Sequence, residues 1–267
     1  MIVTQALRLA ERQLADAGVD TPRVDAELLL AHVLGVSRTG VYANDHQEVP
    51  GRFQVLLGRR SKREPLAYVL GEWGFRRLML KTDARALVPR PETEIVVERC
   101  LELLRGEREP RVLDLGAGTG AIALALADEH PGAQVTAVDS SPEAVALARE
   151  NAERLQLPVE IRQGGFEAAA EGWDLVVSNP PYVAPGEWDT LQPEIREWEP
   201  RDALVGVGLQ EQIARVADTR RLVLEVGDGQ ARGVAAALTS LGYTDVAITS
   251  DLTGIERVVE GHGRRGS

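Results

Sequence analysis

One short stretch places a carboxamide, two prolines and an aromatic ring at a single corner: DLVVSNPPYV, residues 174–183. Each proline fixes its own φ at about −65° and disfavours the helical region for the residue before it, so Asn179 and Pro180 are both held extended. Pro180 has no N–H but keeps its carbonyl. The corner therefore presents two oxygen acceptors, one from the Asn179 side chain and one from the Pro180 backbone.

A planar NH2 group is the natural ligand of such a pair of acceptors. Two oxygens bind its two protons, the ring of Tyr182 stacks beneath the conjugated system, and the nitrogen stays accessible to a reaction partner. Its delocalised lone pair reacts poorly, so acceptors that bind more strongly as positive charge grows on it favour the transition state. The corner predicts orientation of a base amine or a side-chain amide. A strand stopped by prolines, with no chemical role, is the alternative.

A glycine-rich turn is the second feature with chemical meaning. In DLGAGTGAIAL, residues 114–124, Gly116, Gly118 and Gly120 stand between a predicted strand and a predicted helix. Missing side chains let the backbone approach a ligand closely there, and the new helix offers unpaired N–H groups, which suits a nucleotide-like ligand. The turn also satisfies the dinucleotide pattern G-x-G-x-x-G/A, so a nicotinamide dehydrogenase stays open at this point.

Two carboxylates flank this turn. Asp139 ends the next predicted strand, 19 residues after Gly120, where it can accept hydrogen bonds from two ribose hydroxyls. Asp114 stands two residues before the first glycine, where dinucleotide folds usually have an apolar residue. An acid there suits a ligand with an ammonium or sulfonium group. A turn-capping role is the alternative for Asp114.

Alternating helices and strands must position these residues. From residue 91 the apolar pattern predicts repeated βα units, which imply a mostly parallel sheet with helices on both faces. The last two predicted strands, 245–250 and 256–261, lack an intervening helix and are expected to form an antiparallel hairpin at the sheet edge. Ligands bind outside the carboxyl ends of the strands in such sheets, which is where the glycine turn and the proline corner both fall.

The preceding residues have a different pattern. Short helices are predicted up to Gly18, from Pro22 to Gly35 with Thr21 as N-cap, near Pro50 and over 65–70. Mixed alternation after Glu72 favours a β-hairpin. We therefore predict an N-terminal helical bundle over 1–71, a β-hairpin linker over 72–90 and a catalytic α/β domain over 91–267.

Composition narrows the class of protein. The chain has 267 residues, of which 44% are hydrophobic and 27% charged, as in soluble globular proteins. No apolar run approaches the roughly 20 residues of a membrane span, and the N-terminus lacks the features of a secretory signal, so a cytoplasmic protein is expected. Cys100 is the only cysteine and is expected to be a core thiol; the four histidines show no ligand spacing, and no metal is predicted.

The net charge of −11 is unevenly distributed. Residues 1–90 contain 14 Lys and Arg against 10 Asp and Glu, whereas residues 91–267 contain 16 against 31. An acidic catalytic region is a poor match for a nucleic-acid backbone. The basic cluster at Arg52, Arg59, Arg60, Lys62 and Arg63 is expected to be a solvated helix face, although an acidic partner or RNA could also bind it.

DLGAGTG, Asp139 and SNPPY together resemble the class I S-adenosylmethionine-dependent methyltransferases that act on planar nitrogens. Further stretches extend the likeness over essentially the whole chain: LVPRPETE (87–94), EPRDAL (199–204), LEVGDGQ (224–230) and DLTGIERVV (251–259). With the helical bundle, they resemble the peptide chain release factor glutamine methyltransferases. The resemblance implies a Rossmann-like seven-stranded sheet, mostly parallel with the last strand antiparallel. It also implies methyl transfer to the glutamine of the release-factor GGQ motif.

The resemblance also implies roles for particular residues. The residues that would bind S-adenosylmethionine are Asp114, Gly116, Ala117, Gly118, Thr119, Gly120, Asp139, Phe166 and Asn179. The residues that would bind the target amide are Asn179, Pro180, Pro181 and Tyr182, with Asn179, Pro180 and Tyr182 as the catalytic residues. The helical bundle would help to dock the release factor. A monomer with no nucleic-acid substrate and no membrane partner is expected.

The chain departs from the family pattern at two places. In RQGGFEAA, residues 162–169, Gly165 stands where relatives usually have an acid near the adenine, which leaves Phe166 as an apolar contact. The segment 206–221 is short and predicts an abbreviated helix.

Three other functions share part of the pattern. A family that methylates a glutamine of a large-subunit ribosomal protein shares NPPY. An adenine-N6 methyltransferase of nucleic acid suits the same corner but needs a target-recognition module and a basic cleft. A non-catalytic binding protein on the same fold is the third.

Overall fold

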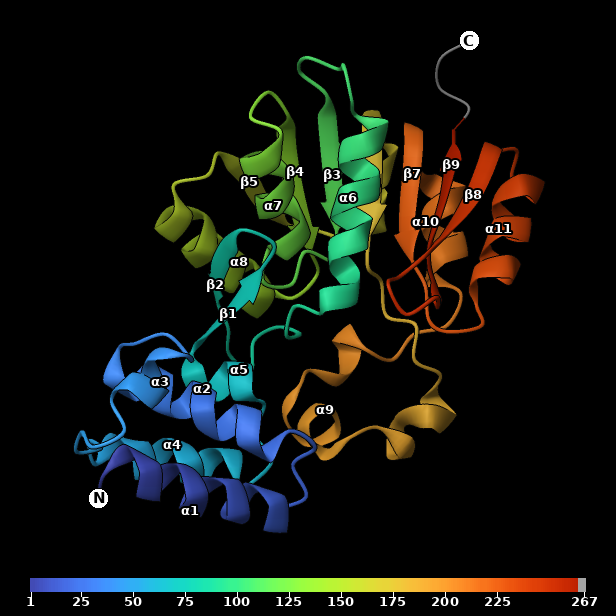
Figure 1. Cartoon of the computed structure of the whole chain (residues 1–267). Coiled ribbons are helices and arrows are strands. Elements are labelled where there is room, and N and C mark those ends of the chain that lie inside the picture. Colours follow the sequence, from blue (N-terminus) through green and yellow to red (C-terminus); the bar gives the residue numbers. More distant parts are fainter. Residues whose placement is uncertain (264–267) are drawn as a thin grey trace. The chain divides into compact units, whose positions relative to one another are not determined.

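The computed structural model describes residues 1–263, which divide into two compact units (Figure 1). One unit contains Met1–Glu72 together with Leu191–Trp198. The other contains Trp73–Thr190 and the described residues from Glu199 onward. The chain therefore leaves the second unit after the proline corner, contributes a short segment to the first, and returns at Glu199.

The first unit is helical. Its members are α1 (Val3–Asp16), α2 (Pro22–Leu34), α3 (Gly40–Ala43), α4 (Arg52–Arg60), α5 (Leu66–Leu70) and, from the returning segment, α9 (Pro193–Trp198). Fully buried Leu29, Leu30 and Phe53 lie in its core. Pro22 begins α2 as predicted, and Gly35 ends it in the left-handed conformation. The sequence did not predict α3 or α9.

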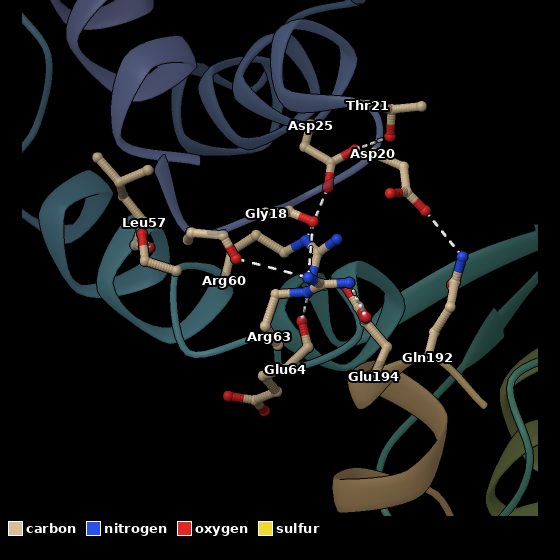
Figure 2. A network of polar contacts seen from close by, with 12 residues as sticks. Gly18, Asp20, Thr21, Asp25, Leu57, Arg60, Arg63, Glu64, Gln192 and Glu194 are labelled. Carbon is tan, nitrogen blue, oxygen red and sulfur yellow. Dashed lines mark hydrogen bonds and ion pairs between the residues drawn. The ribbon is translucent and has the colours of Figure 1, made fainter. Parts of the chain in front are cut away.

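The prediction of a solvated basic face is wrong for two arginines of this unit. The Arg60 side chain is 7% exposed, and it donates to Asp25 Oδ2 (2.7 Å) and to Glu194 Oε1 (2.8 Å). Arg63 donates to both oxygens of Glu194, at 2.6 and 2.5 Å. Figure 2 shows both guanidinium groups between α2 and α9, with Gln192 bonded to Asp20 beside them. These ion pairs fasten α9 to the helical unit.

The second unit is built on a seven-stranded sheet of order β5-β4-β3-β6-β7-β9-β8, which confirms the predicted fold. Strands β3 to β7 pair in parallel, and β9 runs antiparallel to both β7 and β8. The strands are β3 (Arg111–Leu115), β4 (Gln134–Asp139), β5 (Val159–Gln163), β6 (Trp173–Ser178), β7 (Thr219–Glu225), β8 (Thr244–Ser250) and β9 (Glu256–His262).

Helices cover both faces of this sheet (Figure 1). One face packs against α6 (Glu94–Leu103), α7 (Ala121–Glu129) and α8 (Pro142–Leu155), and the other against α10 (Leu209–Val216) and α11 (Ala231–Ser240). Because side chains alternate along a strand, Val112 faces the first layer and Leu113 the second. Cys100 is buried in the first layer, as predicted.

Short elements complete the second unit. The hairpin β1 (Glu72–Phe75) and β2 (Leu78–Lys81) forms at the predicted linker. Single turns of 3-10 helix are η1 (Pro91–Thr93), η2 (Phe166–Glu171), η3 (Pro185–Thr190) and η4 (Arg201–Ala203). The predicted short helix in 206–221 is α10. Within residues 1–263, no helix combines the length and apolarity that a membrane span needs.

The sheet order creates a switch point between β3 and β6. From β3 the chain continues outward to β4 and β5, whereas β6 lies on the opposite side of β3 and continues to β7. Leu115 pairs with Ser178 at the carboxyl ends of the two central strands. The glycine turn and the proline corner therefore begin side by side, at the position where ligands bind in open α/β sheets.

The buried ion pairs of the helical unit lead to a stability prediction. Asp25→Ala should lower the free energy of unfolding by about 3–5 kcal/mol, because it leaves Arg60 buried with one partner fewer. Glu11→Ala is the matched control, since Glu11 pairs with Arg23 in the same unit but both side chains are about 40% exposed; it should cost about 1 kcal/mol or less. Urea unfolding followed by circular dichroism measures both. Equal losses would show that burial does not strengthen the Arg60 pairs.

Candidate active site

A cavity of about 360 Å³ lies at the carboxyl ends of β3, β4 and β6. This volume is within the range of small-molecule sites, about 300–1,000 Å³. The predicted residues that line it are Gly116, Ala117, Gly118, Thr119, Asp139, Phe166, Asn179 and Pro181. Asp114, Gly120, Pro180 and Tyr182 were also predicted but are not among its lining residues.

The glycine turn adopts a backbone that other residues rarely accept. Gly116, Gly118 and Gly120 all have positive φ, at 76°, 56° and 84°. The Gly116 N–H donates to the Val138 carbonyl (2.8 Å), and a Cβ at Gly116 would lie 3.9 Å from the carbonyl oxygen of Asn179. Such a Cβ would make an ordinary van der Waals contact, so it is the positive φ that favours glycine where the turn meets the proline corner.

Asp139 is anchored at the mouth of the turn. Its Oδ2 accepts from the Gly118 N–H (2.8 Å) and its Oδ1 from the Ser141 N–H (2.9 Å). A carboxylate has about four lone-pair sites, so acceptor capacity remains for two hydroxyl groups of a ligand. Phe166 lies at the start of η2 and lines the same cavity. A glycine cradle, a fixed acceptor and an aromatic face fit a nucleoside.

Asp114 is buried beside the turn instead of lining the cavity. It is 0% exposed; its Oδ2 accepts from the Ala123 N–H of α7 (3.1 Å), and its Oδ1 has no hydrogen-bond partner. Burial raises the pKa of Asp114 to about 7; the hydrogen bond from Ala123 opposes this shift, and the nearby charge of Asp139 adds to it. The contact with α7 is the capping role left open by the sequence. A contact with a ligand cation stays a prediction.

The proline corner is held by hydrogen bonds from several segments. Ser178 Oγ donates to the Leu115 carbonyl (2.7 Å), and Asn179 Nδ2 donates to Thr93 Oγ1 (3.3 Å). The Tyr182 carbonyl accepts from Gln230 Nε2 (2.9 Å). The bond to Thr93 uses one of the two N–H groups of Asn179 and leaves its Oδ1 as an acceptor for a ligand.

Sequence reasoning missed the contribution of the linker to this cavity. Residues 85–90 line it together with Ser140, Ser141 and Leu209. Glu199 fastens the linker: its carboxylate accepts from the Val88 N–H (3.1 Å) and from Arg90 Nη2 (2.5 Å). The available signal was the pair of motifs LVPRPETE and EPRDAL, which the structure joins through this carboxylate.

The position of the missing acid is also part of the cavity. Gly165 lines it, and the Gly165 N–H donates to Glu167 Oε1 (2.8 Å). A Cβ at Gly165 would lie 2.6 Å from Glu167 Oε2, so the neighbouring carboxylate occupies space that a larger residue would need. An acid at position 165 would require Glu167 to move.

The sheet order, the glycine turn after β3, the acid at the end of β4 and the NPPY corner after β6 define a class I methyltransferase domain. Comparisons with known families agree. The family described as PrmC N-terminal domain matches residues 5–71, and the family described as methyltransferase small domain matches residues 93–194.

Curated relatives cover nearly the whole chain. A release factor glutamine methyltransferase of Deinococcus radiodurans is 41% identical over 273 residues, covering 97% of this chain and 98% of its own. Those of Geobacter sulfurreducens and Caulobacter vibrioides are 40% and 36% identical and cover 93% and 98% of this chain, and 92% and 96% of their own. The chain belongs to the release factor glutamine methyltransferase family.

Solved structures agree with the fold. The catalytic domain of hMettl16, solved in complex with a MAT2A 3′UTR hairpin, superposes with a TM-score of 0.58 at 15% identity, over 78% of this chain and 81% of its own. Human methyltransferase 10 domain containing protein gives a TM-score of 0.51 at 14% identity, over 68% and 87%. At such low identity these similarities concern the fold alone.

The buried carboxyl of Asp114 leads to a prediction about pH. The folded chain keeps the Asp114 proton up to about pH 7, whereas the unfolded chain releases it near pH 4, so this group lowers stability progressively as pH rises between those values. Asp114→Asn removes the titration and keeps an acceptor for Ala123. The ligand-free variant should therefore gain stability over the wild type between pH 5 and pH 8, at about 1.4 kcal/mol per unit of pKa shift.

Chemical denaturation at the two pH values measures the effect. Asp245→Asn, at an exposed position of β8, is the control and should leave the pH dependence unchanged. If wild type and Asp114→Asn respond to pH in parallel, Asp114 is not the protonated group.

Proposed function

We propose that this protein transfers a methyl group from S-adenosylmethionine to the side-chain amide nitrogen of the GGQ glutamine in peptide chain release factors. One observation carries the proposal. The acceptor corner at Asn179 and the glycine turn at Gly116 line the same cavity, in a chain of the release factor glutamine methyltransferase family.

The methyl donor is S-adenosylmethionine, which supplies a methyl group bonded to positively charged sulfur. The residues at the glycine turn and β4 fit its binding. The backbone from Gly116 to Gly120 would hold the methionine part, Asp139 would accept from the ribose hydroxyls, and Phe166 would pack on the adenine. The Asp114 carboxyl has an unpartnered Oδ1 beside the turn, and a bound cation would lower its pKa and favour its ionised form.

The proline corner would bind the target. Asn179 Oδ1 and the Pro180 carbonyl accept from the two amide protons, Tyr182 stacks against the amide plane, and Pro181 packs beside it. Both acceptors bind more strongly as positive charge develops on the amide nitrogen, which lowers the barrier without a general base. The linker at residues 85–90 forms part of the wall of the cavity.

The helical unit would help to dock the release factor. The family that matches it is a separate domain in front of the methyltransferase domain, and α9 of the segment that follows NPPY belongs to the same unit. A release factor bound to the helical unit would contact a part of the chain that is connected to the proline corner by residues 183–190. The acidic balance of residues 91–267 disfavours nucleic acid as the substrate.

Methylation of purified, unmodified release factor tests the proposed function. Intact-mass analysis should show the addition of one methyl group in the presence of the protein and S-adenosylmethionine. Replacement of the GGQ glutamine by alanine should abolish the addition. Transfer of labelled methyl to a large-subunit ribosomal protein or to nucleic acid, and none to release factor, would assign the enzyme to one of the alternative substrates.

Removal of the proposed acceptor at the corner should separate catalysis from cofactor binding. Asn179→Ala should lower kcat about 10²–10³-fold, equivalent to about 2.7–4 kcal/mol, by analogy with the loss of one preorganised donor from an oxyanion hole. Calorimetry should show the affinity for S-adenosylhomocysteine within a few-fold of wild type. Asn44→Ala, which removes a carboxamide bonded only to Gly40 within the helical unit, is the control. Full activity in Asn179→Ala would remove Asn179 from the mechanism.

A further inference from the structure

A buried polar chain lies behind the proline corner. Asn179 Nδ2 donates to Thr93 Oγ1 (3.3 Å), the Thr93 hydroxyl is close enough to the Glu225 carboxyl to lower its pKa, and the Tyr182 hydroxyl lies 3.5 Å from Glu225 Oε1. Thr93 is 5% exposed and Glu225 is 1% exposed. Thr93 belongs to LVPRPETE and Glu225 to LEVGDGQ. These polar contacts therefore connect two motifs with no assigned chemistry to Asn179 and Tyr182 of NPPY.

The Glu225 carboxylate determines which group donates and which accepts in each of these contacts. An ionised Glu225 can only accept hydrogen bonds. The Thr93 hydroxyl would therefore donate to Glu225, and its lone pairs would remain for Asn179 Nδ2. If the Asn179 amide turned over, its oxygen would face those same lone pairs. The favoured arrangement thus has the Asn179 nitrogen toward Thr93 and the Asn179 oxygen on the opposite side.

We propose that Thr93 and Glu225 are positioning residues for methyl transfer, which hold Asn179 with its amide oxygen, and not its amide nitrogen, toward the target NH2 group. This inference rests on the proposed function, because a target with two N–H donors needs an acceptor at Asn179. A reversed amide would set donor against donor and leave the target amide unbound in its reactive orientation.

The same segment also supports Tyr182. Gln230 Nε2 donates to the Tyr182 carbonyl (2.9 Å), while Gln230 Oε1 accepts from the Gly227 N–H (3.1 Å). A Cβ at Gly227 would lie 3.0 Å from Tyr182 Cδ2, so the aromatic ring packs directly over this glycine. Glu225, Gly227 and Gln230 therefore form one support behind the corner.

The protonation state of Glu225 determines whether Thr93 stays a donor to Glu225 and an acceptor for Asn179. Burial raises the pKa of Glu225 to about 7; Glu92 also raises it, while the hydrogen bonds from Thr93 and Tyr182 and the charge of Arg257 lower it. Burial raises the pKa of Tyr182 to about 12, so its hydroxyl stays a donor. A protonated Glu225 can donate to Thr93 and permit the reversed arrangement. We expect kcat to rise with pH through about 7.

Two substitutions at position 93 isolate the hydroxyl group. Thr93→Val keeps the shape and removes the acceptor for Asn179; it should lower kcat about 10–100-fold, as loss of an orienting partner does at other sites. The KM for release factor and the Kd for S-adenosylhomocysteine should stay within about twofold. Thr93→Ser restores the hydroxyl and should recover most of the activity. Equal losses in Thr93→Val and Thr93→Ser would show that the hydroxyl group does not restore activity and would overturn the proposal.

A matched control and a double variant sharpen this test. Thr219→Val removes a buried hydroxyl at the opposite end of the same strand as Glu225, where it donates to the Arg221 carbonyl (2.9 Å), and should leave kcat within about twofold. Added to Asn179→Ala, Thr93→Val should cause no further loss, because Thr93 acts through Asn179. A full additional loss in the double variant would contradict the proposal.

The pH profile gives an independent readout through Glu225. Glu225→Gln keeps one acceptor but removes the titration, so its kcat should be lower and should no longer rise through about pH 7. A profile that keeps the wild-type rise would exclude Glu225 as the titrating group. Wild-type methylation of release factor is measured first: failure there overturns the proposed function, whereas wild-type activity with an unaffected Thr93→Val overturns only the positioning role.

Discussion

The parallel pairing of β3 with β6 brings the glycine turn and the proline corner of the second unit to one place. Leu115 and Ser178 lie opposite each other at the last pair of this ladder, and Ser178 Oγ also donates to the Leu115 carbonyl. The glycine turn and the proline corner each begin at the next residue. A shift of one residue in the register would turn the side chains of β6 to the other face of the sheet and move Asn179 away from Gly116. Hydrophobic layers on both faces hold that register.

Two buried carboxyls lie on the same face of this sheet, close to the site. Asp114 near the end of β3 and Glu225 at the end of β7 each have one unpartnered oxygen and a pKa raised to about 7 by burial. A buried polar atom without a partner costs stability, and such atoms are uncommon in folded proteins. These carboxyls lie next to the two segments for which we propose binding roles: Asp114 precedes the glycine turn, and Glu225 lies beside Tyr182 of the proline corner.

The sequence was sufficient to predict the sheet, the helical layers, the glycine turn and the proline corner, because each depends on a local pattern. Alternating apolar residues marked the strands, and proline and glycine marked the corners. It was insufficient wherever a side chain finds a partner far along the chain. Arg60 was read as solvated because Glu194, its partner on α9, lies 134 residues away. Glu199 and Glu225 had no predicted role for the same reason, because local charge patterns do not reveal distant partners.

Directly after the proline corner, the segment between residues 184 and 204 leaves the second unit and returns to it. This segment contributes α9 to the helical unit, yet its two ends are joined within the catalytic unit. The Val183 N–H donates to the Leu204 carbonyl (2.9 Å), and the Gly206 N–H donates to the Val183 carbonyl (3.1 Å). Asn179 to Tyr182 are therefore fixed between β6 and this bridge. The geometry of the proline corner is set within the second unit, by β6 on one side and by this bridge on the other.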